Sequence, residues 1–262
     1  LLKKRIRQIR PDALLIGEVW EDASNKVAYG VHRRYFVDGV LDSVMNYPFR
    51  TAILRFLRKE DDGQGLRETV ETVLENYPAQ VAACNMNLLG THDTPRALSA
   101  MLSDGFDSRE ENARWQFSPE ELETAKTRLR MATALQFTLP GSPSIYYGDE
   151  AGMEGGKDPF NRRTYPWGNG DNALLEHYRR LGSLRKAWDA LRMGTLEFTH
   201  ATGGRVSYIR ALGNTKLKIF CNCSDTPWEI SCGGVLLGNA YEAIAPGCLR
   251  VMPMGWCIAE AL

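Results

Sequence analysis

The chain has 262 residues, of which 44% are hydrophobic and 24% are charged, proportions typical of a globular protein that buries a core. Lysine plus arginine and aspartate plus glutamate both number 32, so no net charge favours nucleic acid or an anionic membrane as a partner. No apolar run approaches the roughly 20 residues needed to cross a bilayer, and a small neutral ligand fits this balance better.

The first ten residues carry apolar side chains at helical spacing between lysines and arginines. Leu2, Ile6 and Ile9 predict a helix with a basic face that Pro11 ends. This start lacks the apolar core of a signal peptide, and the chain does not open with methionine. We therefore expect the sequence to be the C-terminal part of a longer protein.

The cysteines crowd toward the end of the sequence, where five of the six lie between residues 221 and 257. Their spacing does not match the paired Cys-x-x-Cys pattern of a zinc site. We expect reduced, packed cysteines, because free cysteine is among the most buried residue types. Reduced cysteines favour a cytoplasmic location.

Residues 13–17 form a short continuous apolar run, which predicts a parallel strand buried on both faces, with Glu18 at its C-terminal end. Further strands are expected at 40–47, 86–89 and 144–147, and helices at 48–58, 66–76, 119–137 and 173–191. Strands that alternate with helices indicate a parallel α/β architecture, in which ligands bind at the carboxyl ends of the strands.

From about residue 195 the helical period gives way to short β-branched and aromatic runs separated by Gly, Asn and Pro. Strands are expected at 205–211, 216–221 and 249–252. We therefore divide the chain into a catalytic α/β part, residues 1–193, and a small all-β part, residues 194–262.

Three segments each close a predicted strand with polar residues: 16–20 (IGEVW), 87–96 (NLLGTHDTPR) and 141–150 (GSPSIYYGDE). In this order and at this spacing they resemble the α-amylase superfamily of glycoside hydrolases, within it the neopullulanase and cyclomaltodextrinase-like group. The run DPFNRR at 158–163 is also similar to that group. The resemblance covers nearly the whole chain and is weakest in the all-β part.

The resemblance implies a fold and a reaction. The fold is the C-terminal half of a (β/α)8 TIM barrel, strands 5–8, followed by a small β-sandwich. The reaction is retaining, double-displacement hydrolysis of α-1,4-linked glucans, with α-1,6 bonds as a further substrate. Such a reaction requires a carboxyl group that acts as acid and base, and a carboxylate that attacks the anomeric carbon.

Glu18 takes the acid/base role by this resemblance, and the same comparison assigns Asp93 and His92 to gripping sugar hydroxyls at the reacting ring. Trp20 is expected to form a stacking platform for a sugar, although an isolated Trp is more often plain packing. Asp158 and Arg162 resemble a pair that binds glucose units on the non-reducing side; a structural salt bridge is the alternative.

No nucleophilic aspartate and no calcium ligands of the family precede Glu18, so we expect no cofactor or metal site in this chain and an inactive fragment; calcium would belong to the missing N-terminal half. The alternative is a module that binds α-glucans without cleaving them. A doubly wound nucleotide-binding domain is disfavoured, because no glycine-rich phosphate loop follows a strand. Four parallel strands leave open edges, so we expect a homo-oligomer.

Overall fold

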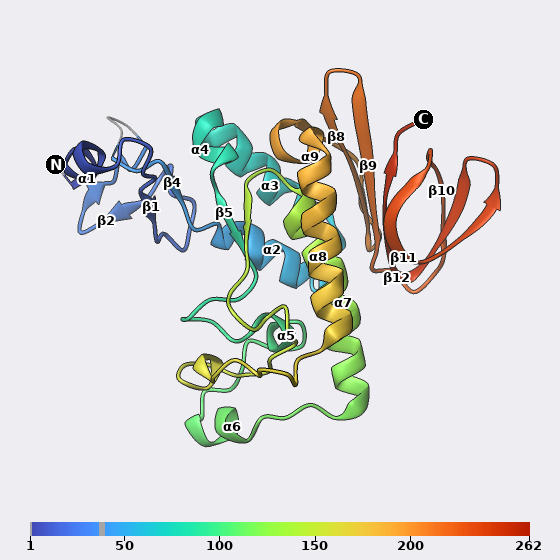
Figure 1. Ribbon diagram of the computed structural model, residues 1–262, viewed down its shortest axis with the longest axis horizontal. Helices are drawn as coiled ribbons and strands as arrows, with labels where there is room; N and C mark the ends of the chain where they lie inside the picture. Colours follow the sequence, from blue (N-terminus) through green and yellow to red (C-terminus); the bar gives the residue numbers. More distant parts are fainter. Residues whose placement is uncertain (1, 37–39) are drawn as a thin grey trace.

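The computed structural model describes residues 2–36 and 40–262, and its secondary structure changes character along the chain. Short parallel strands and helices come first, and long antiparallel strands follow. Figure 1 shows the first strands at one end of the molecule, the antiparallel sheet at the other, and helices α7 and α8 between them. Within the described ranges, none of the helices combines the length and apolar character that crossing a bilayer requires.

The parallel part is built from four very short strands: β1 (Ile16–Gly17), β4 (Ser43–Val44), β5 (Met86–Leu88) and β6 (Ser142–Ser144). β1 pairs in parallel with β4, and β5 pairs in parallel with β6. A parallel bridge between Met45 and Met86 joins the two pairs. The order is that of a partial barrel, as expected for strands 5–8. A small hairpin, β2 (Val27–Ala28) and β3 (Val31–His32), lies between β1 and β4 in the sequence.

Side-chain amides hold the ends of these short strands together. The Nδ2 of Asn46 donates to Oδ1 of Asn87 at 2.8 Å, and Nδ2 of Asn87 donates to the Pro140 carbonyl at 2.8 Å. Gln136 donates from one Nε2 to the carbonyls of Asn87 and Ser144, at 3.0 and 2.8 Å. Because buried amides are costly unless paired, these bonds fix the relative positions of neighbouring strand ends.

The strand expected at 13–17 is confirmed at its end, but its predicted burial on both faces is wrong. Leu14 is 58% exposed and Ile16 is 38% exposed. Among the described residues, β1 has β4 as its neighbour on one side and no strand on the other. The composition of the run is typical of a buried parallel strand. In the described structure, however, one edge of β1 is open, so its apolar side chains stay exposed.

The strand expected at 144–147 lies two residues earlier, at β6, and the chain turns at Tyr146 and Tyr147. The expected strand at 40–47 is also shorter, because the Asn46 side chain accepts from the Phe49 N–H and caps the next helix; residues 37–39 lie outside the described part. The helix cap at Asn46 thus ends the earlier strand before its predicted limit.

The helices largely follow their sequence signals. Ser118 and Glu121 form a capping box at the start of α7, and Asp171 caps α8. One helix was expected over 173–191, but the backbone is extended at Trp188 and divides it in two. The helices are α1 (Leu2–Ile9), α2 (Tyr47–Leu57), α3 (Gln64–Asn76), α4 (Ala79–Ala83), α5 (Ala97–Ala100), α6 (Arg109–Arg114), α7 (Pro119–Thr138), the 3₁₀ turn η2 (Phe160–Arg162), α8 (Asn172–Ala187) and α9 (Asp189–Met193).

The last part of the chain is a curled antiparallel sheet of longer strands: β7 (Thr195–Thr202), β8 (Arg205–Leu212), β9 (Thr215–Asn222), β10 (Trp228–Ser231), β11 (Val235–Ala245) and β12 (Cys248–Glu260). β12 pairs with β9, β10 and β11 along its length. All six cysteines are unbridged, and four of them are buried.

One hydrophobic core runs from α2 and α3 through α7 and α8 into this sheet. The hydroxyls of Thr138 on α7 and Tyr208 on β8 lie 2.5 Å apart, and the ring of His177 on α8 packs edge-on against Trp256 on β12 at 5.6 Å. The sheet therefore packs on the helices and is not a separate appendage joined by a flexible link.

Candidate active site

Glu18 and the pair His92–Asp93 come together at the carboxyl ends of β1 and β5. Each of the three offers an oxygen or nitrogen atom, and these atoms all lie within 4.8 Å of one another. All three side chains are exposed. The imidazole Nε2 of His92 lies 3.3 Å from Oδ2 of Asp93. Residues 74 positions apart in the sequence therefore share one polar cluster because parallel strands end at the same edge.

The loop that carries His92 and Asp93 is held by a buried asparagine. Nδ2 of Asn161, whose side chain is fully buried, donates to the carbonyls of His92 and Thr94 at 2.8 Å each and approaches the Thr91 carbonyl at 3.3 Å. The Thr91 hydroxyl accepts from the Asp93 N–H at 3.1 Å. No role for Asn161 is predicted from the sequence, because its partners lie about 70 residues away.

Arg162 connects the two acidic residues predicted from the sequence. Its Nη2 lies 3.2 Å from Oδ1 of Asp93, and its Nε contacts Oδ1 of Asp158. Both groups remain partly exposed, with 44% and 38% of the Arg162 and Asp93 side chains accessible. The arginine thus lies beside the Glu18–Asp93 cluster and keeps one carboxylate on each side of its guanidinium.

Trp20 lies next to the cluster, stacked on Tyr47. The two ring centroids are 4.0 Å apart and their planes differ by 11°. Trp20 is 48% exposed, so Tyr47 covers one face and part of the indole stays accessible. The Tyr47 hydroxyl lies 3.5 Å from both Oε1 of Glu18 and Oγ1 of Thr91. Burial raises the pKa of Tyr47, so its hydroxyl keeps its proton beside the carboxylate.

A buried ion pair supports the loop from beneath. Arg96 is fully buried, lies 3.6 Å from Asp149, and sits 4.5 Å from the ring centroids of both Tyr146 and Tyr147. The two tyrosines of the strand predicted at 144–147 thus follow β6 and pack against Arg96. Burial raises the pKa of Asp149 to about 7, against the opposing charge of Arg96. A Cβ at Gly90 would collide with the Asp149 carboxylate, which accounts for that glycine.

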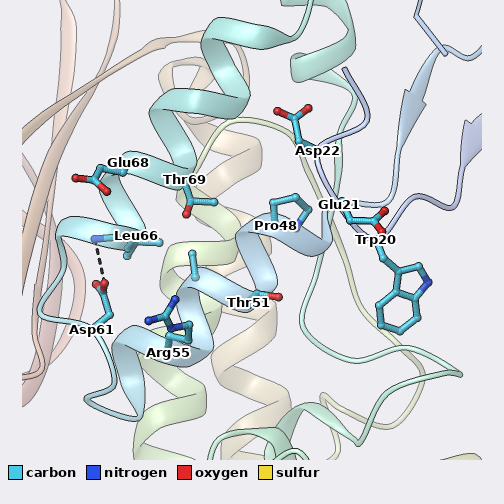
Figure 2. Close-up of a pocket in the computed structure, with 12 residues that line it drawn as sticks. Trp20, Glu21, Asp22, Pro48, Thr51, Arg55, Asp61, Leu66, Glu68 and Thr69 are labelled. Atoms are coloured by element: carbon cyan, nitrogen blue, oxygen red, sulfur yellow. Dashed lines mark hydrogen bonds between the residues drawn. The ribbon is translucent and has the colours of Figure 1, made fainter. Parts of the chain in front are cut away.

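Two cavities flank Trp20 on either side of α2. The first, of about 450 Å³, runs between α2 and α3, and Figure 2 shows Thr51 and Arg55 on α2 with Leu66 and Thr69 on α3. The second, of about 440 Å³, is lined by Asp93 as well as by Trp20, Thr51 and Arg55. The second cavity therefore adjoins the candidate site.

The cluster can exchange protons and bind hydroxyl groups. Two carboxylates and an imidazole supply acceptors and a donor within reach of one small ligand, and Trp20 supplies an apolar face. The same three polar groups could hold a divalent cation, since carboxylate and imidazole are ordinary metal ligands. Because these three side chains are exposed, a ligand can reach them directly from solvent.

Sequence patterns named Glu18, Trp20, His92, Asp93, Asp158 and Arg162, and the structure brings these residues to one region. They did not point to Tyr47, Asn161 or Arg50, which contact the site region through long-range packing. The available signals were that Tyr47 ends the strand predicted at 40–47 and that Asn161 lies inside the run DPFNRR.

Comparisons with known proteins agree with this geometry. Residues 2–173 match the family described as alpha amylase, catalytic domain. The chain is 32% identical over 271 residues to a cyclomaltodextrinase of Geobacillus thermopakistaniensis, covering 98% of this chain and 41% of the relative. It is 37% identical over 222 residues to an amylopullulanase of Thermoanaerobacter thermohydrosulfuricus, covering 80% of this chain and 14% of the relative.

The fold is similar to that of a Nostoc punctiforme debranching enzyme crystallised after soaking with acarbose. The TM-score is 0.76 at 25% identity, covering 99% of this chain and 53% of that protein. The chain thus spans about half or less of the length of these three proteins. The family match covers well over half of the residues and includes the strand ends that carry Glu18, His92 and Asp93. The chain therefore belongs to the α-amylase family.

Proposed function

We propose that this chain provides the acid/base half of a retaining α-glucan hydrolase, with Glu18 as the acid and base. The observation that carries the proposal is the cluster of Glu18, His92 and Asp93 within 4.8 Å at the mouth of the parallel strands. Cleavage with retention needs a carboxyl group that protonates the leaving oxygen and then takes a proton from water. Glu18 is exposed to an entering sugar and lies beside the Tyr47 hydroxyl, which orients it.

Asp93 suits the role of binding sugar hydroxyls better than that of attacking the anomeric carbon. One of its oxygens lies 3.2 Å from the Arg162 guanidinium and the other lies 3.3 Å from the His92 imidazole. Both interactions lower the nucleophilicity of the carboxylate and favour acceptance of hydrogen bonds. Hydrogen bonds of this kind can strengthen as the ring flattens toward an oxocarbenium-like transition state.

The nucleophile then has to come from a carboxylate about 5–5.5 Å from Glu18 on the opposite side of the anomeric carbon. We propose that a residue outside the described cluster supplies it and that the chain by itself does not hydrolyse glucans at an enzymatic rate. Trp20 stacks on a neighbouring glucose, and Asp158 with Arg162 binds a further unit. The names of the relatives point to cyclodextrins and pullulan as substrates to test.

The test compares the 262-residue chain with the longest gene product that contains it, on maltotriose, cyclodextrin and pullulan. We expect reducing sugar from the longer product only, and a loss of at least about a thousandfold in kcat with Glu18→Gln. Glu21→Gln is the matched control, because Glu21 is a neighbouring exposed glutamate that pairs with Lys26. Absence of hydrolysis by the longer product would refute the proposal.

A second candidate function is binding without cleavage by this chain alone. The exposed indole of Trp20 beside Asp93 and Arg162 favours it, because an aromatic face with flanking polar groups is sufficient to hold a sugar. Calorimetry with maltotriose on the 262-residue chain measures this function directly. We expect saturable binding, and a flat titration at millimolar sugar would exclude it.

A further inference from the structure

The cavity of about 440 Å³ beside the candidate site carries more positive than negative charge. It lies along the face of α2 near Trp20 and reaches the loop of Asp93. Its charged lining side chains are Arg50, Arg55, Arg58, Glu60, Asp93, Asp104 and Lys157. A water-accessible pocket with this composition attracts an anion more strongly than it attracts a neutral sugar. The charged side chains that lack a partner therefore decide which ligand it binds.

The carboxylates of this lining already have cationic partners. Arg58 binds both oxygens of Asp104, at 2.9 and 3.0 Å, and lies 3.8 Å from Glu60. Asp93 is held by Arg162, as described above. The lining lysine, Lys157, is in turn paired with Asp107 at 2.9 Å. These pairs leave the remaining two cations, Arg50 and Arg55, to be accounted for.

Arg50 and Arg55 have no acidic partner in the part of the chain that the structure describes, where no carboxylate oxygen lies within 4.0 Å of either guanidinium. Arg55 is exposed on α2. Figure 2 shows its guanidinium extending from α2 into the first cavity, and Arg55 also lines the second. An unpaired arginine at the mouth of a pocket is free to close on a ligand.

Arg50 is a stronger signal because it is 93% buried, with only 7% of its surface exposed. Its Nε donates to the Leu89 carbonyl at 2.8 Å, which directs the guanidinium toward the start of the loop that carries His92 and Asp93. Its Nη2 is buried without a hydrogen-bond partner. Burial lowers the pKa of Arg50 to about 10. The charge of Asp104 acts on Arg50 without contacting it, so the buried Nη2 lacks an acceptor, which is costly, and an acceptor oxygen from a ligand would relieve that cost.

We propose that this cavity binds the phosphoryl group of a phosphorylated glucose unit, next to the glucan held at the Glu18–Asp93 cluster. Arginine forks match phosphate oxygens in geometry, and a phosphoryl group offers acceptors to both Arg50 and Arg55. Trp20 lines the same cavity and supplies the apolar face for the sugar ring. The sugar part of this inference rests on the proposed function, while the phosphate part rests on the unpaired arginines.

Calorimetry on the 262-residue chain tests the inference with glucose 6-phosphate, glucose and inorganic phosphate as separate probes. We expect glucose 6-phosphate to bind at least about tenfold more tightly than either other probe, since a charge-assisted arginine–phosphate contact adds to the sugar contact. The advantage should shrink as salt is raised from about 0.05 to 0.5 M, because exposed charges are screened.

Two variants sharpen the test. Arg55→Gln removes an exposed charge without disturbing packing, and should reduce the affinity for glucose 6-phosphate toward that for glucose. Arg179→Gln makes the same change on α8 at an exposed residue outside the cavity lining, and should leave the affinity for glucose 6-phosphate unchanged. Arg50→Met should abolish the phosphate advantage as well; if it fails to fold, the Arg55 result still decides.

Equal binding of glucose and glucose 6-phosphate would overturn the inference, and so would insensitivity to Arg55→Gln. Equal binding of inorganic phosphate and glucose 6-phosphate would overturn the sugar-phosphate assignment. Maltotriose run in parallel separates the two proposals. Maltotriose binding without a phosphate advantage would leave the proposed function standing and this inference refuted, whereas binding of neither sugar would refute both.

Discussion

The parallel strands and the antiparallel sheet differ in where their backbone hydrogen-bond partners come from. β1, β4, β5 and β6 have two or three residues each, and the segment before β1 exposes Leu14. The strands of the final sheet have up to 13 residues and pair with neighbours that are mostly close in sequence. Antiparallel hairpins complete themselves locally, whereas a parallel sheet needs strands from distant segments.

The chemistry lies in the region whose sheet is least complete. Glu18 and Asp93 follow β1 and β5, where the backbone leaves the strand and polar side chains meet, while the described residues of the final sheet add no side chain to that cluster. Stability comes instead from the core that joins α7 and α8 to the sheet. The strand ends therefore position the site, and the helix–sheet core holds the molecule together.

The largest expected effect is a difference in the free energy of unfolding lost when a side chain is truncated in each of the two regions. Trp256 on β12 is 1% exposed, so Trp256→Ala should lower the free energy of unfolding by about 3–5 kcal/mol. Ile16 on β1 is 38% exposed, so Ile16→Ala should cost less than about 1 kcal/mol. Urea unfolding of both variants measures the difference. Equal losses would contradict the claim that stability comes mainly from the helix–sheet core.

A pH effect should come from the same helix–sheet contact. Burial lowers the pKa of His177 from 6.5 to about 4 in the folded chain. The unfolded chain therefore binds the proton better, so stability is complete above pH 6.5 and falls as the pH drops toward 4. The loss should reach up to about 3 kcal/mol. His177→Gln should flatten this part of the stability profile in urea unfolding at several pH values. An unchanged profile would contradict the assignment.

Removal of the Asn161 amide should have a smaller effect on stability but a clear one on the site. Asn161→Ala leaves the carbonyls of His92 and Thr94 without their buried donor, at a cost of about 1–3 kcal/mol. We expect weaker maltotriose binding because the loop of Asp93 loosens. Asn169→Ala, an exposed turn residue, is the control and should bind normally. Calorimetry on a folded Asn161→Ala with unchanged affinity would show that the loop does not depend on Asn161.

The smallest expected effect concerns self-association. We propose that copies of the chain associate through the open edge of β1 to form a dimer or a larger oligomer. Leu14 is 58% exposed beside β1, and burial of such side chains between copies favours association. Leu14→Lys should weaken the association by about tenfold, or about 1.4 kcal/mol. Leu212→Lys, at the exposed end of β8, is the control. A stable monomer of the unmodified chain in sedimentation would contradict the proposal.

Local signals were sufficient for much of the fold. The helix predicted at 119–137 matches α7 closely, and the β-branched runs at 205–211 and 216–221 predicted β8 and β9. The strand predicted at 144–147 lies instead at Ser142–Ser144, and the two tyrosines that follow pack against Arg96, some 50 residues earlier. The run at 13–17 has the composition of a buried strand, but burial depends on neighbouring strands and not on the run itself.

The site could be predicted only where one segment carries the whole signal. Glu18, His92 and Asp93 stand in recognisable strand-end motifs, so their sequence neighbours identify them. Arg50, Tyr47 and Asn161 act through contacts made across 29 to 69 residues, such as Tyr47 with Glu18 and Asn161 with His92. No local pattern assigns a role to these residues, because their roles arise from packing between distant segments.

The central claim is that the ends of β1 and β5 form a single α-glucan site. Nuclear magnetic resonance of the His92 imidazole and the Trp20 indole during a maltotriose titration tests it most directly, with Trp228 on β10 as the reference indole. We predict that His92 and Trp20 shift together with one dissociation constant while Trp228 stays unchanged. Shifts with two different constants, or none at either residue, would contradict the account.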